Sequence, residues 1–454
     1  MNALLIDSCE VVVAMDDAGT EIAGGSILIE DGQVAWVGAG EPPRPPGDLE
    51  RINGRRCVAL PGLVNTHHHL YQALTRVRAQ GKGLFGWLRE LYPVWAGVDE
   101  EWVRTAARVG LAELALSGCA TTTDHHYVFP ARRGDRLAAE IDAARELGLR
   151  FDPCRGSMDL GESAGGLPPD AIVEATDDAL ARTEEAVRRF HDPAPGSMLR
   201  VAIAPCSPFS VSERLMRESA ELARRLGVRL HTHAAETLDE ETHCLERFGR
   251  RPVEVLEDWG WLGPDVWLAH CVHLDEKDAR RIAETGTGVA WCPGSNLRLG
   301  SGIAPGRRLL DEGANVGLGV DGSASNDSGD LLAEARQAML VARASGDAGA
   351  MSAREALRVA TRGGGACLGR DDLGSLEAGM RADIALFPVD GLAFAGADSD
   401  PVAALVFAAP GRVRHLFVEG RAVVRDGVLV TADEVEIAAE GHRVARRIAE
   451  RSRG

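Results

Sequence analysis

Hydrophobic positions along the chain fall into two kinds of pattern. Between about residues 59 and 366, short apolar runs such as 200–204 and 266–270 alternate with longer amphipathic segments such as 213–226 and 276–285. The short runs are typical of buried β-strands, and apolar residues at helical spacing in the longer segments predict α-helices. Strands that alternate with helices form parallel sheets, because each helix carries the chain back across the sheet. The central segment therefore predicts an α/β domain.

Both ends of the chain have the pattern of all-β segments instead. Their short apolar runs, which turn residues separate, lie at 10–14, 26–30, 34–37, 382–387, 413–418 and 421–424. Two such pieces can pair into one small domain that brings the chain ends together. We predict that residues 1–58 and 367–454 form a small β-sandwich domain and that residues 59–366 form the larger α/β domain.

Polar and ionisable residues gather where the predicted strands of the central domain end. The main examples are His67, His69, Asp124, Cys206, His233, His270 and Asp321. A closed (β/α)8 barrel of the TIM type brings all C-terminal strand ends to one mouth, where the active sites of this fold lie. A doubly wound open sheet is the alternative, but it would spread these residues out, and no Gly-x-Gly-x-x-Gly follows the first strand. We therefore predict the barrel.

Composition narrows the functional classes. The chain has 50 Lys and Arg against 68 Asp and Glu, a formal charge of −18, which argues against a nucleic-acid partner. No apolar run reaches the roughly 18 residues of a membrane span, and acidic residues stand where a signal peptide would be basic. The nine cysteines are scattered and never spaced as Cys-x-x-Cys, so a disulfide framework is not expected. We expect a cytoplasmic protein that binds neither nucleic acid nor membrane.

The first chemical signal is a histidine run at residues 65–69, Asn-Thr-His-His-His. Side chains alternate along a strand, so His67 and His69 are expected to share one face, with His68 on the other. Two imidazoles at the end of a strand are suited to hold a metal ion. An accidental run or an expression tag is the alternative, and the internal position within a strand pattern disfavours both.

Two further residues complete a candidate metal centre. His231 and His233 share a face of the next histidine-bearing strand, and we predict that His233, nearer the mouth, is the ligand and His231 a packing residue. Asp321 ends an apolar strand; alone it would be a helix cap, but beside three histidines it is better explained as the fourth ligand. A shell of His67, His69, His233 and Asp321 suits one Zn²⁺ per chain. A two-metal site would need a bridging carboxylate or carboxylated lysine, and no lysine ends a predicted strand.

Two more residues are placed to move protons beside such a metal. Glu236 follows His233 by three residues, and His270 ends the strand 266–270, whereas His273 lies on the following loop. A bound metal lowers the pKa of its water to about 7, so the site predicts addition of water to an electrophilic carbon. In that reaction Glu236 is the expected general acid and His270 the orienting base.

The motifs occur in a fixed order: Pro61-Gly62-x-x-Asn65-Thr66-His67-x-His69, then His233-x-x-Glu236, His270-Cys271-Val272-His273 and Val320-Asp321. Together they resemble the amidohydrolase superfamily, and more narrowly its zinc-dependent deaminase and chlorohydrolase branch. The resemblance runs essentially end to end and includes residues 374–383. It implies that His67, His69, His233 and Asp321 bind zinc. It also implies that Asp321 takes a proton from the attacking water, Glu236 protonates a ring nitrogen, and His270 polarises the hydroxide.

Within that branch, six segments are similar to 8-oxoguanine deaminases: 69–72, 84–88, 91–95, 155–158, 165–170 and 204–210. This resemblance implies hydrolytic deamination of a free nucleobase, 8-oxoguanine or an isocytosine-like ring, with release of ammonia. Gln72 follows His69 by three residues, the spacing at which guanine deaminases place a base-binding glutamine. Gln72 and Cys206 are thus the predicted substrate-binding residues.

Two departures leave alternatives open. Pro205-Cys206-Ser207 stands where guanine deaminases use an arginine segment, and Trp291 stands where many relatives carry a histidine. An s-triazine hydrolase that expels chloride or an alkylamine therefore remains an alternative. A guanine deaminase is the other alternative, although the missing arginine segment weakens it. A catalytically silent scaffold should lack ligands, and here every ligand position is filled. The expected partners are a small-molecule nucleobase and further copies of the chain in a homo-oligomer.

Overall fold

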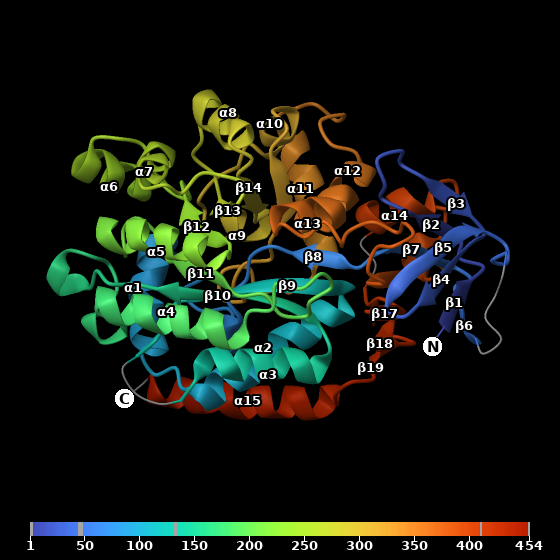
Figure 1. Ribbon diagram of the computed structural model, residues 1–454, viewed down its shortest axis with the longest axis horizontal. Coiled ribbons are helices and arrows are strands. Elements are labelled where there is room, and N and C mark those ends of the chain that lie inside the picture. Colours follow the sequence, from blue (N-terminus) through green and yellow to red (C-terminus); the bar gives the residue numbers. More distant parts are fainter. Residues whose placement is uncertain (1–2, 44–48, 131–133, 409–410, 453–454) are drawn as a thin grey trace.

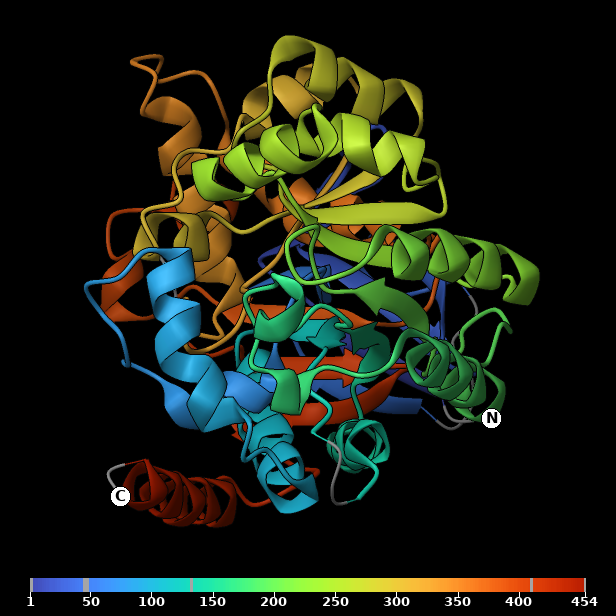
Figure 2. The same cartoon turned by 90° about the vertical axis from the view of Figure 1, so that its left-hand side faces the viewer.

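The computed structural model describes residues 3–43, 49–130, 134–408 and 411–452. Its larger part is a closed barrel of eight parallel strands with helices packed around it (Figures 1 and 2). The strands, in chain order, are β8 (Leu63–Asn65), β9 (Cys119–His126), β10 (Arg150–Ser157), β11 (Ala202–Pro205), β12 (Leu230–Ala234), β13 (Val266–His270), β14 (Gly288–Trp291) and β15 (Asn315–Leu318). β15 pairs with β8 and closes the barrel. The predicted (β/α)8 barrel is thereby confirmed, and the open-sheet alternative is wrong.

The barrel strands are buried almost throughout, as expected of parallel strands that helices cover. The helices outside it are α2 (Glu100–Leu116), α3 (Arg136–Leu147), α4 (Thr176–Phe190), α5 (Glu213–Leu226), α6 (Leu238–Phe248), α7 (Pro252–Asp258), α8 (Glu276–Glu284), α9 (Pro293–Arg298), α10 (Gly306–Asp311), α11 (Leu331–Arg343), α12 (Ala353–Arg358) and α13 (Gly364–Cys367). Local sequence sets their ends. In α5, for example, the Ser212 side chain accepts the Leu215 N–H, and Gly227 ends the helix at a φ of +69°.

Two elements between β8 and α2 cover the mouth of the barrel. They are the short 3₁₀ helix η1 (Leu70–Thr75) and helix α1 (Leu84–Trp95). The indole N–H of Trp87 in α1 donates to the carbonyl of Ala324, which follows β15. This insertion therefore lies across the C-terminal ends of the strands, over the region where the active site is expected.

Strands from both chain ends build the second, smaller domain. They are β1 (Ala3–Asp7), β2 (Val11–Val13), β3 (Glu21–Ala23), β4 (Gly25–Glu30), β5 (Gln33–Ala39), β6 (Leu49–Asn53), β7 (Cys57–Pro61), β16 (Ile384–Pro388), β17 (His415–Val418), β18 (Arg421–Arg425) and β19 (Val428–Leu429). β16 pairs antiparallel with β7, which joins the two ends in one seven-stranded sheet. Ile6 and Ile29 of the four-stranded sheet share a buried core with Ile384 and Phe417 of this sheet. The predicted β-sandwich from both ends is present.

The last helix, α15 (Glu434–Arg451), lies along the barrel helix α2 (Figure 1). Its apolar residues Val444 and Ile448 join a buried cluster that contains Trp102 and Val103 of α2. Residues 367–454, which we assigned to the small domain, thus include a helix that packs on the barrel. An apolar stripe marks such a helix in sequence but does not reveal which surface it covers.

Buried ion pairs join the bottom of the barrel to the chain that leads into the small domain. Arg370, which follows α13, donates from Nε and Nη2 to the Asp152 carboxylate on β10 at 3.0 and 2.7 Å. Both side chains are nearly inaccessible to solvent.

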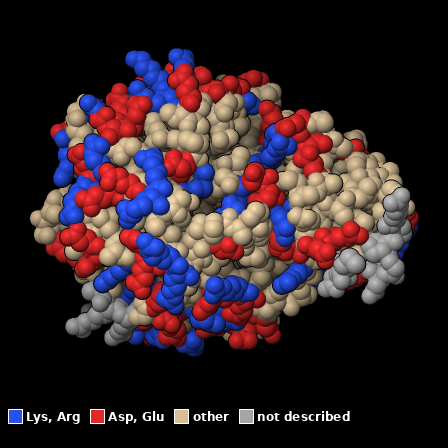
Figure 3. All heavy atoms as spheres, viewed as in Figure 1, with Lys and Arg blue, Asp and Glu red and all other residues tan. Residues whose placement is uncertain are grey.

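None of the described helices is both long and apolar enough to cross a membrane. On the face shown in Figure 3, acidic and basic side chains are interspersed.

Candidate active site

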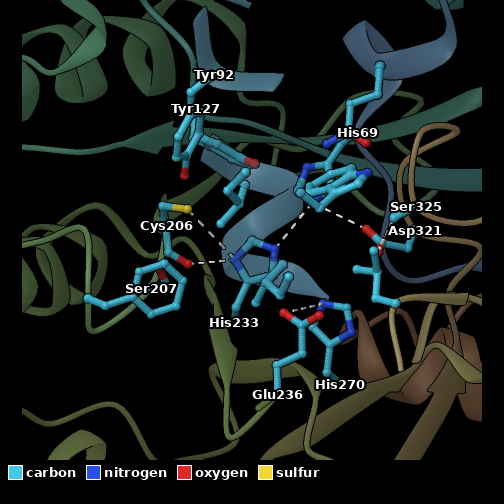
Figure 4. Close-up of a pocket in the computed structure, with 16 residues that line it drawn as sticks. His69, Tyr92, Tyr127, Cys206, Ser207, His233, Glu236, His270, Asp321 and Ser325 are labelled. Atoms are coloured by element: carbon cyan, nitrogen blue, oxygen red, sulfur yellow. Dashed lines mark hydrogen bonds and ion pairs between the residues drawn. The ribbon is translucent and has the colours of Figure 1, made fainter. Parts of the chain in front are cut away.

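The six side chains predicted to perform the chemistry converge at the C-terminal ends of the strands. His233 lies on β12 and His270 ends β13, and the other four lie just beyond strand ends: His67, His69, Glu236 and Asp321. β8 ends at Asn65, so His67 and His69 belong to the segment between β8 and η1 and not to the strand itself. All six are buried. Figure 4 shows five of them, from His69 to Asp321, around one pocket.

Four of these side chains meet at one point. The Asp321 Oδ1 atom lies 3.3 Å from both His67 Nε2 and His69 Nε2, and His69 Nε2 lies 3.2 Å from His233 Nε2. His67 Nε2 and Asp321 Oδ1 have no hydrogen-bond partner among the described residues. Buried polar atoms are nearly always paired, so this convergence needs a further group at its centre. Three imidazoles and a carboxylate are a typical donor set for zinc, and the geometry fits a single metal ion.

Backbone carbonyls orient two of the histidines. His69 Nδ1 lies 2.7 Å from the carbonyl oxygen of His125, and His233 Nδ1 lies 2.6 Å from that of Cys206. A carbonyl can only accept, so both Nδ1 atoms carry the proton, and both Nε2 atoms present a lone pair to the centre. Burial lowers the pKa of His233 to about 3, which keeps its ring neutral as a ligand must be.

His231 orients the remaining histidine. Its Nδ1 donates to the carbonyl of Trp267 at 2.9 Å, so its Nε2 is unprotonated and accepts from His67 Nδ1 at 2.8 Å. His67 Nε2 is therefore unprotonated and faces Asp321. The His231 ring also stacks on the Trp267 indole, with ring centroids 4.4 Å apart. His231 is thus a hydrogen-bonded packing histidine beside the cluster.

Asp321 is held by two serines that the sequence did not reveal. Ser295 Oγ and Ser325 Oγ donate to Asp321 Oδ2 at 2.5 and 2.8 Å, which leaves Oδ1 for the histidines. The backbone of Asp321 is in the left-handed region, with φ at +59°, a conformation that is rare for a residue with a Cβ. Burial alone would raise the pKa of Asp321, but the neighbouring rings of His67, His69 and His270 lower it well below its usual value.

Glu236 and His270 form a second pair next to this cluster. Glu236 Oε2 lies 3.6 Å from His270 Nε2, and His270 Nδ1 donates to Asn296 Oδ1 at 3.0 Å. Burial raises the pKa of Glu236 to about 7, so the group exchanges a proton near neutrality. Burial lowers the pKa of His270, but the carboxylates of Glu236 and Asp321 outweigh it and the net shift is upward. The pair is therefore arranged to pass a proton.

A pocket with an empty volume of about 380 Å³ adjoins the cluster. The predicted substrate-binding residues Gln72 and Cys206 both line it. Gln72 Oε1 is buried without a hydrogen-bond partner among the described residues, which leaves an acceptor free for a ligand. Burial raises the pKa of the Cys206 thiol to about 12, so it faces the pocket as a neutral group. The rest of the wall is mainly apolar or aromatic: Leu84, Trp87, Leu88, Tyr92, Tyr127, Phe209 and Leu299.

Sequence reasoning missed part of this wall, and the structure settles two positions that the sequence left open. The chain has three tyrosines, and two of them, Tyr92 and Tyr127, line the pocket; their rarity was a usable signal. His273 does not line the pocket, since its Nε2 lies 2.9 Å from the carbonyl of Ser301. Trp291, which stands where many relatives carry a histidine, is buried against Gly306 and does not line the pocket either.

Comparison of the sequence and the fold with known proteins identifies the protein family. The model of the amidohydrolase family matches residues 58–423, and the chain belongs to that family. It is 47% identical to an 8-oxoguanine deaminase of Pseudomonas aeruginosa, over 94% of this chain and 95% of that protein. It is 40% identical to a hydroxydechloroatrazine ethylaminohydrolase of Pseudomonas sp. (strain ADP), over 99% and 96%. The atrazine chlorohydrolase TrzN from Arthrobacter aurescens TC1, solved with zinc, superposes with a TM-score of 0.92 at 36% identity, covering 97% and 100%.

The predicted superfamily is thereby confirmed, and the protein is an enzyme, a deaminase or related hydrolase of the amidohydrolase superfamily. A divalent metal is usual in this family, and the donor set around Asp321 fits one. The silent-scaffold alternative has no support in a site that retains every predicted side chain.

Proposed function

We propose that the enzyme is a zinc-dependent deaminase of free nucleobases that converts 8-oxoguanine to urate and ammonia and also accepts isocytosine-like rings. The observation that carries the proposal is the placement of Gln72, which lines the pocket beside the convergent histidines and whose buried amide oxygen has no hydrogen-bond partner among the described residues. An amide both donates and accepts, as the edge of an oxopurine requires. The similarity to the 8-oxoguanine deaminase of P. aeruginosa supports the same substrate.

The ion would be held by His67, His69, His233 and Asp321, one per chain. When bound, zinc supplies a Lewis acid that makes water nucleophilic near neutral pH. Asp321 Oδ1 faces the centre and can accept the proton of the attacking water, while the two serines on Oδ2 keep the carboxylate in place.

Glu236 and His270 serve the second proton transfer, the one to the substrate ring. Because the pKa of Glu236 is near 7, its carboxyl can deliver a proton to a ring nitrogen and recover one, which a carboxyl at its ordinary pKa does poorly at neutral pH. His270, fixed through Nδ1 by Asn296, directs Nε2 toward the attacking oxygen. Ammonia leaves when the exocyclic amine, rather than the new oxygen, is protonated.

The pocket favours a free base over a nucleoside. Leu84, Trp87 and Leu88 of α1 contribute apolar surface and are at most 8% exposed, so the helix closes the space beside the ring. Ribose hydroxyls placed against that wall would lose their hydrogen bonds to water without replacement. The related 5-methylthioadenosine/S-adenosylhomocysteine deaminase of Natronomonas pharaonis, 36% identical, is named for nucleoside substrates; the α1 wall argues against such substrates here.

An s-triazine hydrolase is the second candidate, because the ethylaminohydrolase and TrzN are similar along nearly the whole chain. The test is ammonia release by the zinc-loaded enzyme on 8-oxoguanine, isocytosine and guanine, beside chloride or alkylamine release from s-triazines. We expect ammonia from 8-oxoguanine and isocytosine, and none from zinc-loaded Glu236→Gln. Turnover of triazines alone, of guanine alone, or of none of these compounds would overturn the proposal.

A further inference from the structure

Two glutamates next to the segments that carry the reacting groups are buried without a cation. Glu240 lies in the first turn of α6 and Glu334 near the start of α11, and they are 0% and 2% exposed. Neither forms an ion pair with a lysine or arginine of the described part of the chain. Buried carboxylates are rare unless they are paired, so each needs a compensating set of hydrogen bonds. That set lies in the loops that carry the reacting groups.

Glu240 accepts hydrogen bonds from the turn that carries Glu236. Its Oε1 accepts the Ala235 N–H at 2.8 Å, and its Oε2 accepts the Glu236 N–H at 2.9 Å. Ala235 has a φ of +51°, which is a strained backbone conformation for alanine. The two hydrogen bonds hold this strained turn, and the turn in turn directs the Glu236 side chain toward His270.

Glu334 makes the same kind of contact on the other side of the mouth. Its Oε2 accepts the Gly294 N–H at 2.9 Å, and its Oε1 accepts from Asn326 Nδ2 at 2.8 Å. A Cβ on Gly294 would lie 2.3 Å from Glu334 Oε1, so the first turn of α9 can approach the carboxylate this closely only with glycine at this position. Ser295 follows directly and donates to Asp321. The Glu334 carboxylate thus joins the start of α9, which follows β14, to the loop after β15.

Helix α9 also contacts His270. Asn296, two residues after Gly294, accepts the Nδ1–H of His270 at 3.0 Å. Asn326 Nδ2 donates to the Val320 carbonyl at 2.8 Å, next to Asp321, in addition to its bond with Glu334. The Glu334 carboxylate therefore supports two sets of contacts. One is the hydrogen bond of Asn296 with His270, and the other is formed by Ser295 and Asn326 at Asp321 and its neighbour Val320.

We propose that Glu240 and Glu334 are positioning residues: Glu240 holds Glu236, and Glu334 holds Asp321 and His270, each through N–H groups of the loops at the barrel mouth. The inference rests on the proposed function, because it assumes the roles of these three side chains. It assigns the two glutamates no contact with the substrate.

The direction of these hydrogen bonds suggests a substitution that tests them with little change in side-chain shape. All four hydrogen bonds run from an N–H to a carboxylate oxygen. A glutamine has the same shape but only one acceptor oxygen, so its NH₂ group would face a second N–H donor. Glu240→Gln and Glu334→Gln therefore each keep one hydrogen bond and replace the other with two opposed donors. Glu→Asp keeps both acceptors on a shorter side chain and is the conservative variant that should restore part of the activity.

Steady-state kinetics on zinc-loaded protein is the first readout. A displacement of a reacting group by about 1 Å costs about 100-fold in rate, so we expect kcat of each glutamine variant to fall by about that factor with little change in KM. Zinc content should stay at one per chain. The matched control is Glu355→Gln, which removes the acceptor for the Ser352 N–H at the start of α12, away from the pocket. A kcat equal to that of this control in either variant would overturn the assignment of that glutamate.

Amide hydrogen exchange is the second readout and does not depend on turnover. In Glu240→Gln we expect faster exchange at the amides of Ala235 and Glu236, with that of Gly294 unchanged. In Glu334→Gln we expect faster exchange at Gly294, with Ala235 and Glu236 unchanged. Equal exchange in variant and wild type would overturn the inference, and the aspartate variants serve if a glutamine variant does not fold. If wild-type enzyme releases no ammonia from any base, the proposed function fails, while the exchange pattern still decides whether the glutamates hold these loops.

Discussion

Substitution of Glu236 by glutamine should stabilise the metal-free protein at alkaline pH. Burial raises the pKa of this carboxyl from 4.5 to about 7, and the side chain is only 3% exposed, so solvent screens it little. Between these two pH values the folded protein keeps a proton that the unfolded chain has lost. The unfolding free energy therefore falls as the pH rises from 4.5 to 7, and the full penalty is present above pH 7.

The size of the penalty follows from the two pKa values. Their difference of about 2.5 corresponds to about 3 kcal/mol when the carboxyl is ionised in the folded state. Glutamine does not titrate, so it removes this dependence on pH. We expect the stability of Glu236→Gln relative to wild type to rise by about 2–3 kcal/mol between pH 5 and pH 8.

Urea unfolding of chelator-treated wild type and variant at the two pH values measures this quantity, because contributions of groups that do not interact with Glu236 cancel in the comparison. Asp275→Asn is the control: the backbone N–H of Asp278 holds the pKa of Asp275 below its usual value, so this carboxyl is ionised in both states throughout the range and the relative stability of the variant should not change from pH 5 to pH 8. A relative stability of Glu236→Gln that stays constant from pH 5 to pH 8, or falls, would refute the reasoning. Such a result would mean that burial does not raise the pKa of Glu236 to near neutrality.

Three further substitutions test the site and its support. His231→Phe keeps a flat ring but removes the acceptor for His67 Nδ1–H, and it should weaken zinc binding about 10- to 100-fold in competition with a chelator. Asp321→Asn removes the one anionic ligand, and we expect elemental analysis to find less than one zinc per chain. Asp152→Ala leaves Arg370 buried without its carboxylate and should lower the unfolding free energy by about 3–5 kcal/mol in urea titrations; a change below about 1 kcal/mol would contradict this.

The sequence predicted the parts of the site that follow from strand ends. Parallel strands in a barrel share one mouth, so His233, His270 and Asp321 could be brought together without knowing any distance. His67 and His69 were paired by the alternation of a strand, yet they lie beyond the end of β8. The pairing still succeeded because two residues separated by one can present their side chains to the same point from an extended segment.

Contacts that depend on tertiary packing could not be predicted. Ser295, Asn296 and Ser325 look like ordinary turn residues, and only the meeting of the loops after β14 and β15 shows that they orient Asp321 and His270. Helix α15 carries an apolar stripe that packs against α2, but its sequence does not show which helix it packs against.

The central claim is that His67, His69, His233 and Asp321 hold one metal ion. Anomalous diffraction from a crystal of the zinc-loaded enzyme, collected above and below the zinc edge, tests this most directly. We expect a single strong peak within about 2.0–2.2 Å of one nitrogen from each histidine and one oxygen of Asp321. A structure with zinc bound elsewhere, or with full zinc content and any of these four side chains turned away from the ion, would contradict the account.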